Sequence, residues 1–274
     1  MTVITNGTYY LFVGLKTGVL KASQRACYTG TVARLAFDLI AFDADDTLWH
    51  NERSYRDARQ QFCRVLASAG VTLDDDAIEE HVNRVELANL EFYGYGVSSF
   101  ALSLFETAID LSDGRITGDG LREIVALSKE MLREDIELFP GVREALATLA
   151  AAYPLMLITK GDLLHQTSKL ERSGLREYFR SVEIVSHKTP DTYARILSRH
   201  GIEPGRFLMV GNSLRSDVLP VLELGGSAVH VPAALSWSHE HADVPDEVKG
   251  RFAEAEALGQ LPVLIDRLFA SDAR

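Results

Sequence analysis

The chain has 274 residues, of which 46% are hydrophobic and 24% charged, proportions typical of a soluble globular protein. This length accommodates one large domain, or a core domain that carries a smaller one. The net charge of −11 disfavours nucleic-acid binding, because that affinity depends on a basic surface that neutralises phosphates. A small phosphorylated partner stays compatible with this charge, since it needs only a few local positive groups.

The cysteines and the apolar runs bear on the cellular compartment. Cys27 and Cys63 lack the spacing of metal ligands and do not suggest a disulfide framework, so we expect a reducing, cytoplasmic compartment. No stretch reaches the roughly 18 apolar residues that a membrane-spanning helix requires, and we expect no membrane partner. The sequence does not predict the oligomeric state.

The N-terminal segment differs in composition from the rest of the chain. The first 35 residues include four basic residues and no acidic one. We interpret residues 1–34 as a poorly ordered extension. A signal peptide is the alternative, but Lys16 interrupts the apolar stretch and no clear cleavage site follows.

Five apolar runs of strand length follow one another from about residue 35 onward. The first, at 35–42, is too continuous for a half-exposed strand and is typical of a buried parallel strand. The four similar runs lie at 154–159, 181–186, 206–211 and 227–232. Helix signals follow these runs, such as Thr189 before Pro190, and the stretch after Asp246 suggests a C-terminal helix. This alternation predicts an α/β fold with a doubly wound parallel sheet.

More than 100 residues separate the first two of these strands, far beyond an ordinary crossover connection. Apolar residues recur there at three- and four-residue intervals, which indicates amphipathic helices over 52–70, 74–92, 98–111 and 120–135. We therefore predict a core domain over 35–49 and 137–274, with a four-helix domain inserted at 50–136. The break at 94–96 is interpreted as a turn rather than as a substrate-contacting loop.

Two aspartates, Asp43 and Asp45, follow the first strand in the sequence FDADDTL. Ligands bind at the carboxyl ends of strands in open α/β sheets. Carboxylates at this spacing repel each other unless a cation lies between them, and oxygen ligands of this kind suit Mg²⁺, which also binds substrate phosphate. Taken alone, the short pattern is as typical of a solvated turn.

Polar residues at the ends of the next three strands strengthen the case for a site. They are Thr159, Lys160 and Gly161 after the second strand, Lys188 after the third, and Asn212 and Asp217 after the fourth. A hydroxyl and free backbone N–H groups before a helix make a phosphate site, and a lysine is a point charge suited to phosphate. Because the carboxyl ends of successive parallel strands converge, these groups predict one crevice.

The four motifs resemble, in their order, those of the haloacid dehalogenase superfamily. FDADDTL is similar to its first motif, LMLIT to the second, Lys188 to the third and GNSLRSD to the fourth, while the helical insertion resembles its C1 cap. The resemblance covers about residues 35–266. It implies a magnesium-dependent phosphatase that hydrolyses a phosphate monoester, and a cap leaves little room for a folded protein substrate, so we expect a small phosphorylated metabolite.

The same resemblance implies roles for individual residues. Asp43 attacks phosphorus and forms an aspartyl-phosphate, and Asp45 acts as general acid and then as general base. Thr159 and Lys188 are catalytic groups that contact the phosphoryl oxygens. The residues implied to bind the substrate are Thr159, Lys160, Gly161 and Lys188.

The implied ligands of Mg²⁺ are Asp43, the backbone carbonyl of Asp45, Asn212 and Asp217. Asn212 departs from the family pattern, which has aspartate there, so it brings no negative charge to the ion. Asp217 would supply that carboxylate directly or through water.

Three functions stay open at this point: the phosphatase, a 2-haloacid dehalogenase-type hydrolase that cleaves a carbon–halogen bond, and a non-catalytic protein that binds a phosphorylated ligand. Enzymes of the dehalogenase type usually lack the second aspartate, so Asp45 argues against that alternative. Asn212 alone favours a binding protein. Transfer of the phosphoryl group to an acceptor other than water also stays open.

Overall fold

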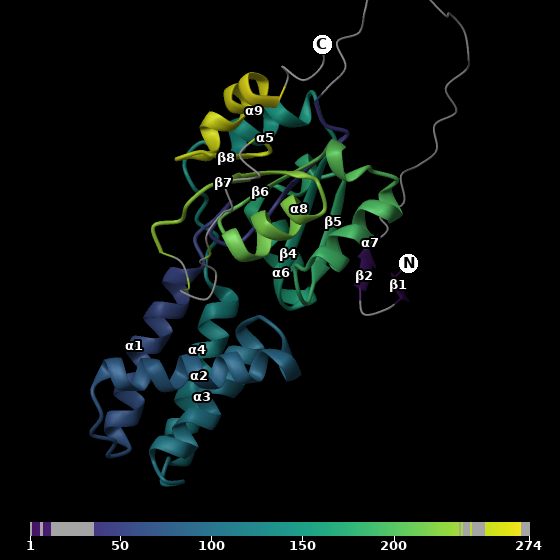
Figure 1. Ribbon diagram of the computed structural model, residues 1–274. Helices are drawn as coiled ribbons and strands as arrows, with labels where there is room; N and C mark the ends of the chain where they lie inside the picture. Colours follow the sequence, from purple (N-terminus) through teal and green to yellow (C-terminus); the bar gives the residue numbers. More distant parts are fainter. Residues whose placement is uncertain are drawn as a thin grey trace, which may run out of the picture.

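The computed structural model describes residues 2–5, 8–11, 36–235, 237, 242 and 250–269. Within this part of the chain, a six-stranded sheet has the order β5-β4-β3-β6-β7-β8, with every neighbouring pair parallel (Figure 1). The strands are β3 (Leu39–Phe42), β4 (Leu155–Lys160), β5 (Ser181–Val185), β6 (Phe207–Gly211), β7 (Ser227–His230) and β8 (Phe252–Glu254). The chain adds β4 and β5 on one side of β3 and then β6, β7 and β8 on the other. The loops that follow β3 and its neighbours therefore leave a crevice at the carboxyl end of β3.

Helices cover both faces of this sheet, as its continuous apolar strands require. On one face, Ile40 and Phe42 of β3 pack with α5 (Val142–Ala150), α6 (Leu163–Ser173) and α9 (Leu261–Phe269). On the other face, Leu39 and Ala41 pack with α7 (Pro190–His200) and α8 (Leu219–Glu223). The alternation of side chains along β3 thus divides the core into two layers, and the predicted doubly wound α/β fold is confirmed.

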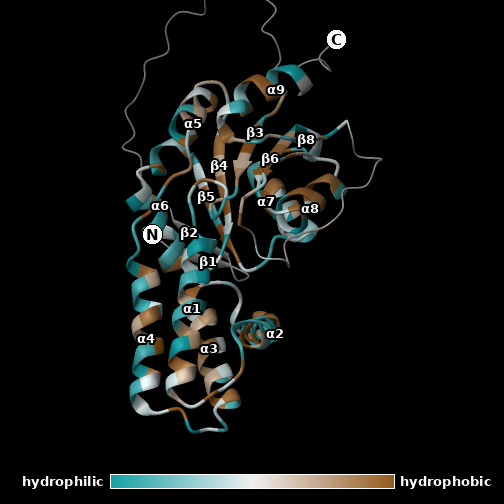
Figure 2. Ribbon diagram, turned by 90° about the vertical axis from the view of Figure 1, so that its left-hand side faces the viewer, coloured by the Kyte–Doolittle hydropathy of each residue, from teal (hydrophilic) through white to brown (hydrophobic). Residues whose placement is uncertain are grey.

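Four helices form a cap with an apolar core of its own. They are α1 (Glu52–Ser68), α2 (Asp75–Tyr93), α3 (Val97–Leu111) and α4 (Gly118–Arg133). Phe62, Phe100 and Leu104 are fully buried among them, in a cluster separate from those of the sheet. Figures 1 and 2 show the four helices gathered on one side of the sheet domain. The predicted helical insertion is confirmed, while its boundaries at 50 and 136 stay predictions.

The two connections between cap and core run side by side in opposite directions. The backbone N–H of Phe139 donates to the carbonyl of Leu48 at 3.0 Å, and that of His50 donates to the carbonyl of Glu137 at 3.0 Å. The cap is therefore joined to the core through a short paired segment directly after the Asp43 loop.

Some elements differ from the sequence expectation. Residues 252–254 after Asp246 form the edge strand β8 rather than part of a helix, because their backbone pairs with β7 and Ala253 is buried. Near the N-terminus, β1 (Thr2–Thr5) and β2 (Thr8–Leu11) pair antiparallel. The rest of the predicted extension at 1–34 lies outside the described residues. No helix in the described ranges is long and apolar enough to cross a membrane.

Gly211, the last residue of β6, lies directly against the side chain of Asp217. A Cβ atom at Gly211 would lie 2.2 Å from Asp217 Oδ2 and 2.3 Å from its Cγ, far inside van der Waals contact. Asp217 belongs to a π-helical turn over Leu214–Val218. The absence of a side chain at Gly211 is what allows this turn to place the Asp217 carboxylate on the end of β6.

We predict that Gly211→Ala lowers the free energy of unfolding by about 1–3 kcal/mol, as overpacking of a close-packed site does. Denaturant unfolding would measure this loss. Gly205→Ala is the matched control, because a Cβ there meets no atom within 4 Å. Equal stability of the two variants would show that the contact with Asp217 is not tight.

Candidate active site

A cavity of about 140 Å³ lies between the carboxyl edge of the sheet and the cap. Loops after β3, β4, β5 and β6 meet there, since β3 is central and β4 and β6 flank it. All the site residues predicted from the sequence line this cavity, namely Asp43, Asp45, Thr159, Lys160, Gly161, Lys188, Asn212 and Asp217. Side chains from distant parts of the chain are thus brought to one place by the order of the strands.

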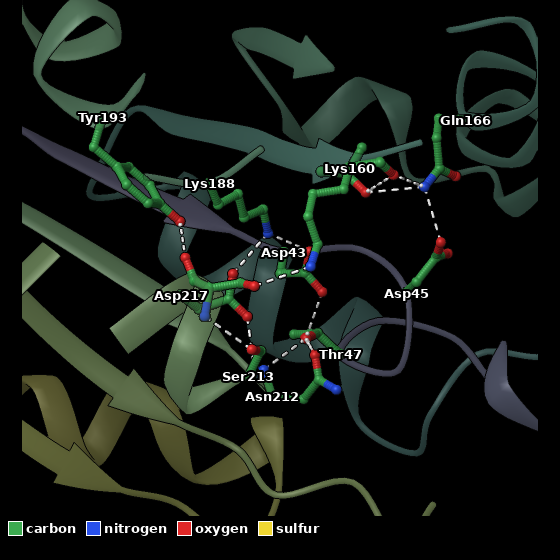
Figure 3. Close-up of polar contacts among 12 residues, drawn as sticks. Asp43, Asp45, Thr47, Lys160, Gln166, Lys188, Tyr193, Asn212, Ser213 and Asp217 are labelled. Carbon is green, nitrogen blue, oxygen red and sulfur yellow. Dashed lines mark hydrogen bonds and ion pairs between the residues drawn. The ribbon is translucent and has the colours of Figure 1, made fainter. Parts of the chain in front are cut away.

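Lys188 lies buried between two carboxylates (Figure 3). Its ammonium forms an ion pair with Asp43 Oδ1 and another with Asp217 Oδ1 at 2.6 Å. Burial lowers the pKa of Lys188, but Asp217 and Asp43 outweigh it and raise this pKa to about 12. Burial also raises the pKa of Asp43 to about 6, in spite of the attraction of Lys188. Two carboxylates therefore share one cation, which leaves a negative excess at the carboxyl end of β3.

Asp45 is held by partners other than Asp43. Its carboxylate accepts a hydrogen bond from Trp49 Nε1 at 2.7 Å and from Gln166 Nε2 at 2.8 Å, and it forms an ion pair with Lys169. Figure 3 shows it pointing toward Gln166. Burial raises the pKa of Asp45, but Lys169 and these hydrogen bonds outweigh burial, and the pKa lies below its ordinary value. In this arrangement Asp45 is an ionised acceptor rather than a proton donor.

The hydroxyl of Thr47 brings the first and fourth motifs together. It lies 3.0 Å from Asp43 Oδ2 and 3.2 Å from Asn212 Oδ1, and it accepts a hydrogen bond from the Asn212 N–H at 3.1 Å. Since the hydroxyl has one proton, it donates to one of these two oxygens at a time. The carboxylate of Asp43 and the amide of Asn212 therefore present oxygens to the same small volume.

Asp217 lies deeper than the other predicted metal ligands. Only 1% of its surface is exposed, Oδ1 pairs with Lys188, and Oδ2 accepts from the Ser213 N–H at 3.0 Å. Its main contact is thus with Lys188. Among the described residues, no three His, Cys, Asp or Glu side chains gather as a metal-binding cluster. A divalent ion here would depend on Asn212 and backbone oxygens as well as on carboxylates.

Sequence reasoning missed two residues of α6 that contact the site. Gln166 Nε2 lies 3.0 Å from Thr159 Oγ1, and Lys169 contacts Asn51 Oδ1 at 3.0 Å in addition to Asp45. The spacing of Gln166 and Lys169 puts both on one face of the helix, four and seven residues after Asp162. The three-residue spacing of these two polar side chains, on a helix that begins directly after Lys160 and Gly161, is the sequence signal that could have identified them.

The cap contributes the break at 94–96 to the cavity lining. The Lys160 ammonium lies 4.0 Å from the centroid of the Tyr95 ring, a cation–π contact. A Cβ at Gly96 would lie 2.8 Å from Asp162 Oδ2, so this break packs closely on the loop after β4. The break at 94–96 is a turn between α2 and α3, as predicted, and it also lines the cavity.

The structure thus belongs to the class of capped α/β proteins that have a charged cavity at the switch point of a parallel sheet. The chain matches the model of the haloacid dehalogenase-like hydrolase family over residues 37–225, and it belongs to this family. The predicted superfamily is therefore confirmed.

Curated relatives and a solved structure are similar over most of the chain. Glyceraldehyde 3-phosphate phosphatase of Methanothermobacter thermautotrophicus is 25% identical over 72% of this chain and 86% of its own length. Human N-acylneuraminate-9-phosphatase is 24% identical over 75% of this chain and 84% of its own length. A haloacid dehalogenase-like family hydrolase from Xanthomonas campestris superposes with a TM-score of 0.77 and 39% identity, over 94% of this chain and 100% of that one.

The burial of Lys188 leads to a prediction about stability. Lys188→Met leaves Asp43 and Asp217 buried without their cation, which should cost about 3–5 kcal/mol of unfolding free energy. Without Lys188, the pKa of Asp43 rises further above its ordinary value, so protonation of this carboxyl relieves part of the loss. The deficit should shrink as the pH falls from the higher pKa of Asp43 in the variant toward its wild-type pKa of about 6.

Urea unfolding at several pH values would measure this effect. Lys129→Met, the same change on the exposed surface of α4, is the control and should have little effect. A deficit independent of pH would mean that lost packing, rather than unpaired charge, dominates.

Proposed function

We propose that the protein is a magnesium-dependent phosphatase that hydrolyses a phosphate monoester of a small metabolite through an aspartyl-phosphate on Asp43. The observation that carries the proposal is the buried contact of Asp43 with Lys188 at the carboxyl end of β3, in the cavity between the sheet and the cap. The curated phosphatases support the class of enzyme, a phosphoric monoester hydrolase. The small volume of the cavity supports a small substrate.

In the first step, a carboxylate oxygen of Asp43 attacks phosphorus, and the bond from phosphorus to the ester oxygen breaks. Lys188 and Thr159 bind the phosphoryl oxygens and offset their charge, with Lys160 and Gly161 beside them. Asp45 gives a proton to the departing alkoxide. Because the Lys169 ammonium holds the pKa of Asp45 low, Asp45 must first leave Lys169 and take up a proton from solvent.

In the second step, Asp45 takes a proton from a water molecule, whose oxygen attacks phosphorus and breaks the bond to Asp43. Inorganic phosphate leaves, and Asp43 regains its carboxylate. The proton that Asp45 gave to the alcohol is replaced by the proton from water, so the site returns to its starting charge.

The residues present fit Mg²⁺, since Asp43 and Asn212 offer hard oxygen donors near one hydroxyl and the site has a negative excess. Asp43, the Asp45 carbonyl and Asn212 would hold the ion, with Asp217 contributing directly or through water. When bound, the ion offsets negative charge on the phosphoryl group and Asp43.

We expect Asp43→Asn to abolish hydrolysis of p-nitrophenyl phosphate, because an amide is too poor a nucleophile to form the intermediate. The assay, run with and without Mg²⁺ on a panel of phosphorylated metabolites, also tests the proposal as a whole. Asp57→Asn, an exposed aspartate of α1, is the control and should keep full activity. Residual turnover above about a tenth of wild type would rule out Asp43 as the nucleophile.

The alternatives give different outcomes in the same assays. Halide release from a 2-haloacid without added metal would favour the dehalogenase-type reaction. Binding of phosphorylated compounds without turnover of any of them, in the presence of Mg²⁺, would favour the non-catalytic protein.

The fourth motif gives a separate prediction about metal affinity. Asn212→Asp adds a carboxylate beside the ion and should tighten Mg²⁺ binding about tenfold, roughly 1.4 kcal/mol. Asp217→Asn should weaken it, because it removes negative charge from the site. Calorimetric titration with Mg²⁺, together with the concentration that gives half-maximal activity, measures both effects. Unchanged affinity in both variants would place the fourth motif away from the metal.

A further inference from the structure

The cap side of the cavity contains a buried group of three charged residues, Glu52, Arg59 and Glu86, which we call the cap triad. Arg59 Nη1 lies 3.2 Å from Glu52 Oε1, and Nη2 lies 2.6 Å from Glu86 Oε2. Glu52 and Arg59 come from α1, and Glu86 comes from α2. All three line the same cavity as Asp43. None of them has a role in the steps proposed above.

Charge in the cap triad is unbalanced, because two carboxyl groups share one guanidinium. Burial raises the pKa of Glu52 to about 7, in spite of Arg59 nearby, and it also raises the pKa of Glu86. The charge of Arg59 is therefore already neutralised within the triad. A carboxylate arriving in this part of the cavity would find no unpaired cation to offset its charge, while Glu86 repels it.

Arg59 nevertheless retains one hydrogen-bond donor. Arg59 is 9% exposed, and within the described part of the chain its Nε is buried and has no hydrogen-bond acceptor. Buried donors of this kind usually have a partner, so this one indicates a bound molecule. The guanidinium lies 5.4 Å from the centroid of the Phe100 ring, which Tyr55 also contacts at 5.0 Å between centroids. Packing against Phe100 therefore holds the guanidinium of Arg59 in place.

We propose that the cap triad recognises an uncharged oxygen, a hydroxyl or carbonyl, on the substrate body remote from the phosphate, and rejects a carboxylate there. A hydroxyl can accept from Arg59 Nε and donate to a glutamate, so it satisfies both groups at once. The cavity of about 140 Å³ is close to the size of engineered cavities that take up benzene, which limits the body to a few carbon atoms. The substrate class is a short polyol or hydroxycarbonyl monophosphate, and this inference rests on the phosphatase function proposed above.

Two compounds of equal length test this inference. Glycerol 3-phosphate and 3-phosphoglycerate differ only in a terminal hydroxymethyl or carboxylate group. Each is measured as a competitor of p-nitrophenyl phosphate hydrolysis by the wild-type enzyme with Mg²⁺. We expect an inhibition constant at least about tenfold lower for glycerol 3-phosphate, since like charges placed together cost several kcal/mol. Ethanolamine phosphate, which ends in an ammonium, is a third arm and should bind less tightly than glycerol 3-phosphate.

Glu86→Gln and Glu52→Gln test the triad separately, since each keeps the shape of the side chain and removes one carboxylate. Either change frees charge on Arg59, so the preference for glycerol 3-phosphate over 3-phosphoglycerate should fall several-fold in each folded variant. Glu91→Gln, on the exposed surface of α2, is the matched control and should leave the ratio unchanged. Circular dichroism identifies which variants are folded.

The outcomes separate this inference from the function on which it rests. Four outcomes overturn the inference alone. They are equal inhibition by the two three-carbon compounds, failure of both to compete, tighter binding of ethanolamine phosphate than of glycerol 3-phosphate, and an unchanged inhibition ratio in both glutamine variants. Absence of any p-nitrophenyl phosphate hydrolysis by the wild-type enzyme overturns the proposed function, and the inference with it.

Discussion

The buried contact of Lys188 with Asp43 and Asp217 is the interaction on which the rest of the site depends. A charge removed from water is costly unless an opposite charge accompanies it. The three side chains come from loops after β5, β3 and β6, so their pairing fixes how these loops lie relative to one another. Gly211 makes this possible, since a side chain there would displace Asp217. Thr47 then ties Asn212 to the same cluster.

The cavity has two zones of different charge. On the sheet side, Asp43 and Asp217 share Lys188, while Lys160 and Lys169 lie nearby, which suits a cation and a phosphoryl group bound together. On the cap side, Arg59 is neutralised by two glutamates, which suits an uncharged group. A phosphate monoester has this same division, with its charge at one end. The chemistry therefore belongs to the sheet domain, while selection among esters belongs to the cap.

Much of this arrangement could be predicted from the sequence, because parallel strands buried on both faces are continuous apolar runs. Once those runs are recognised, the residues after Phe42, Thr159, Val185 and Gly211 must converge at one edge. Other features depend on side-chain packing that no short pattern records. The partners of Asp45 lie on α6, and β8 is a three-residue edge strand whose pairing with β7 depends on tertiary contact.

Lys169 connects the Asp45 carboxylate with the cap. Its ammonium contacts the Asp45 carboxylate and also the side-chain amide oxygen of Asn51, the residue directly before α1. One cation thus joins Asp45, the proposed proton-transfer group, to the residue from which the cap begins. A displacement of α1 that moves Asn51 alters the electric field at Asp45, and by reciprocity protonation of Asp45 alters the energy of that displacement. The protonation of Asp45 and the position of the cap are therefore thermodynamically linked.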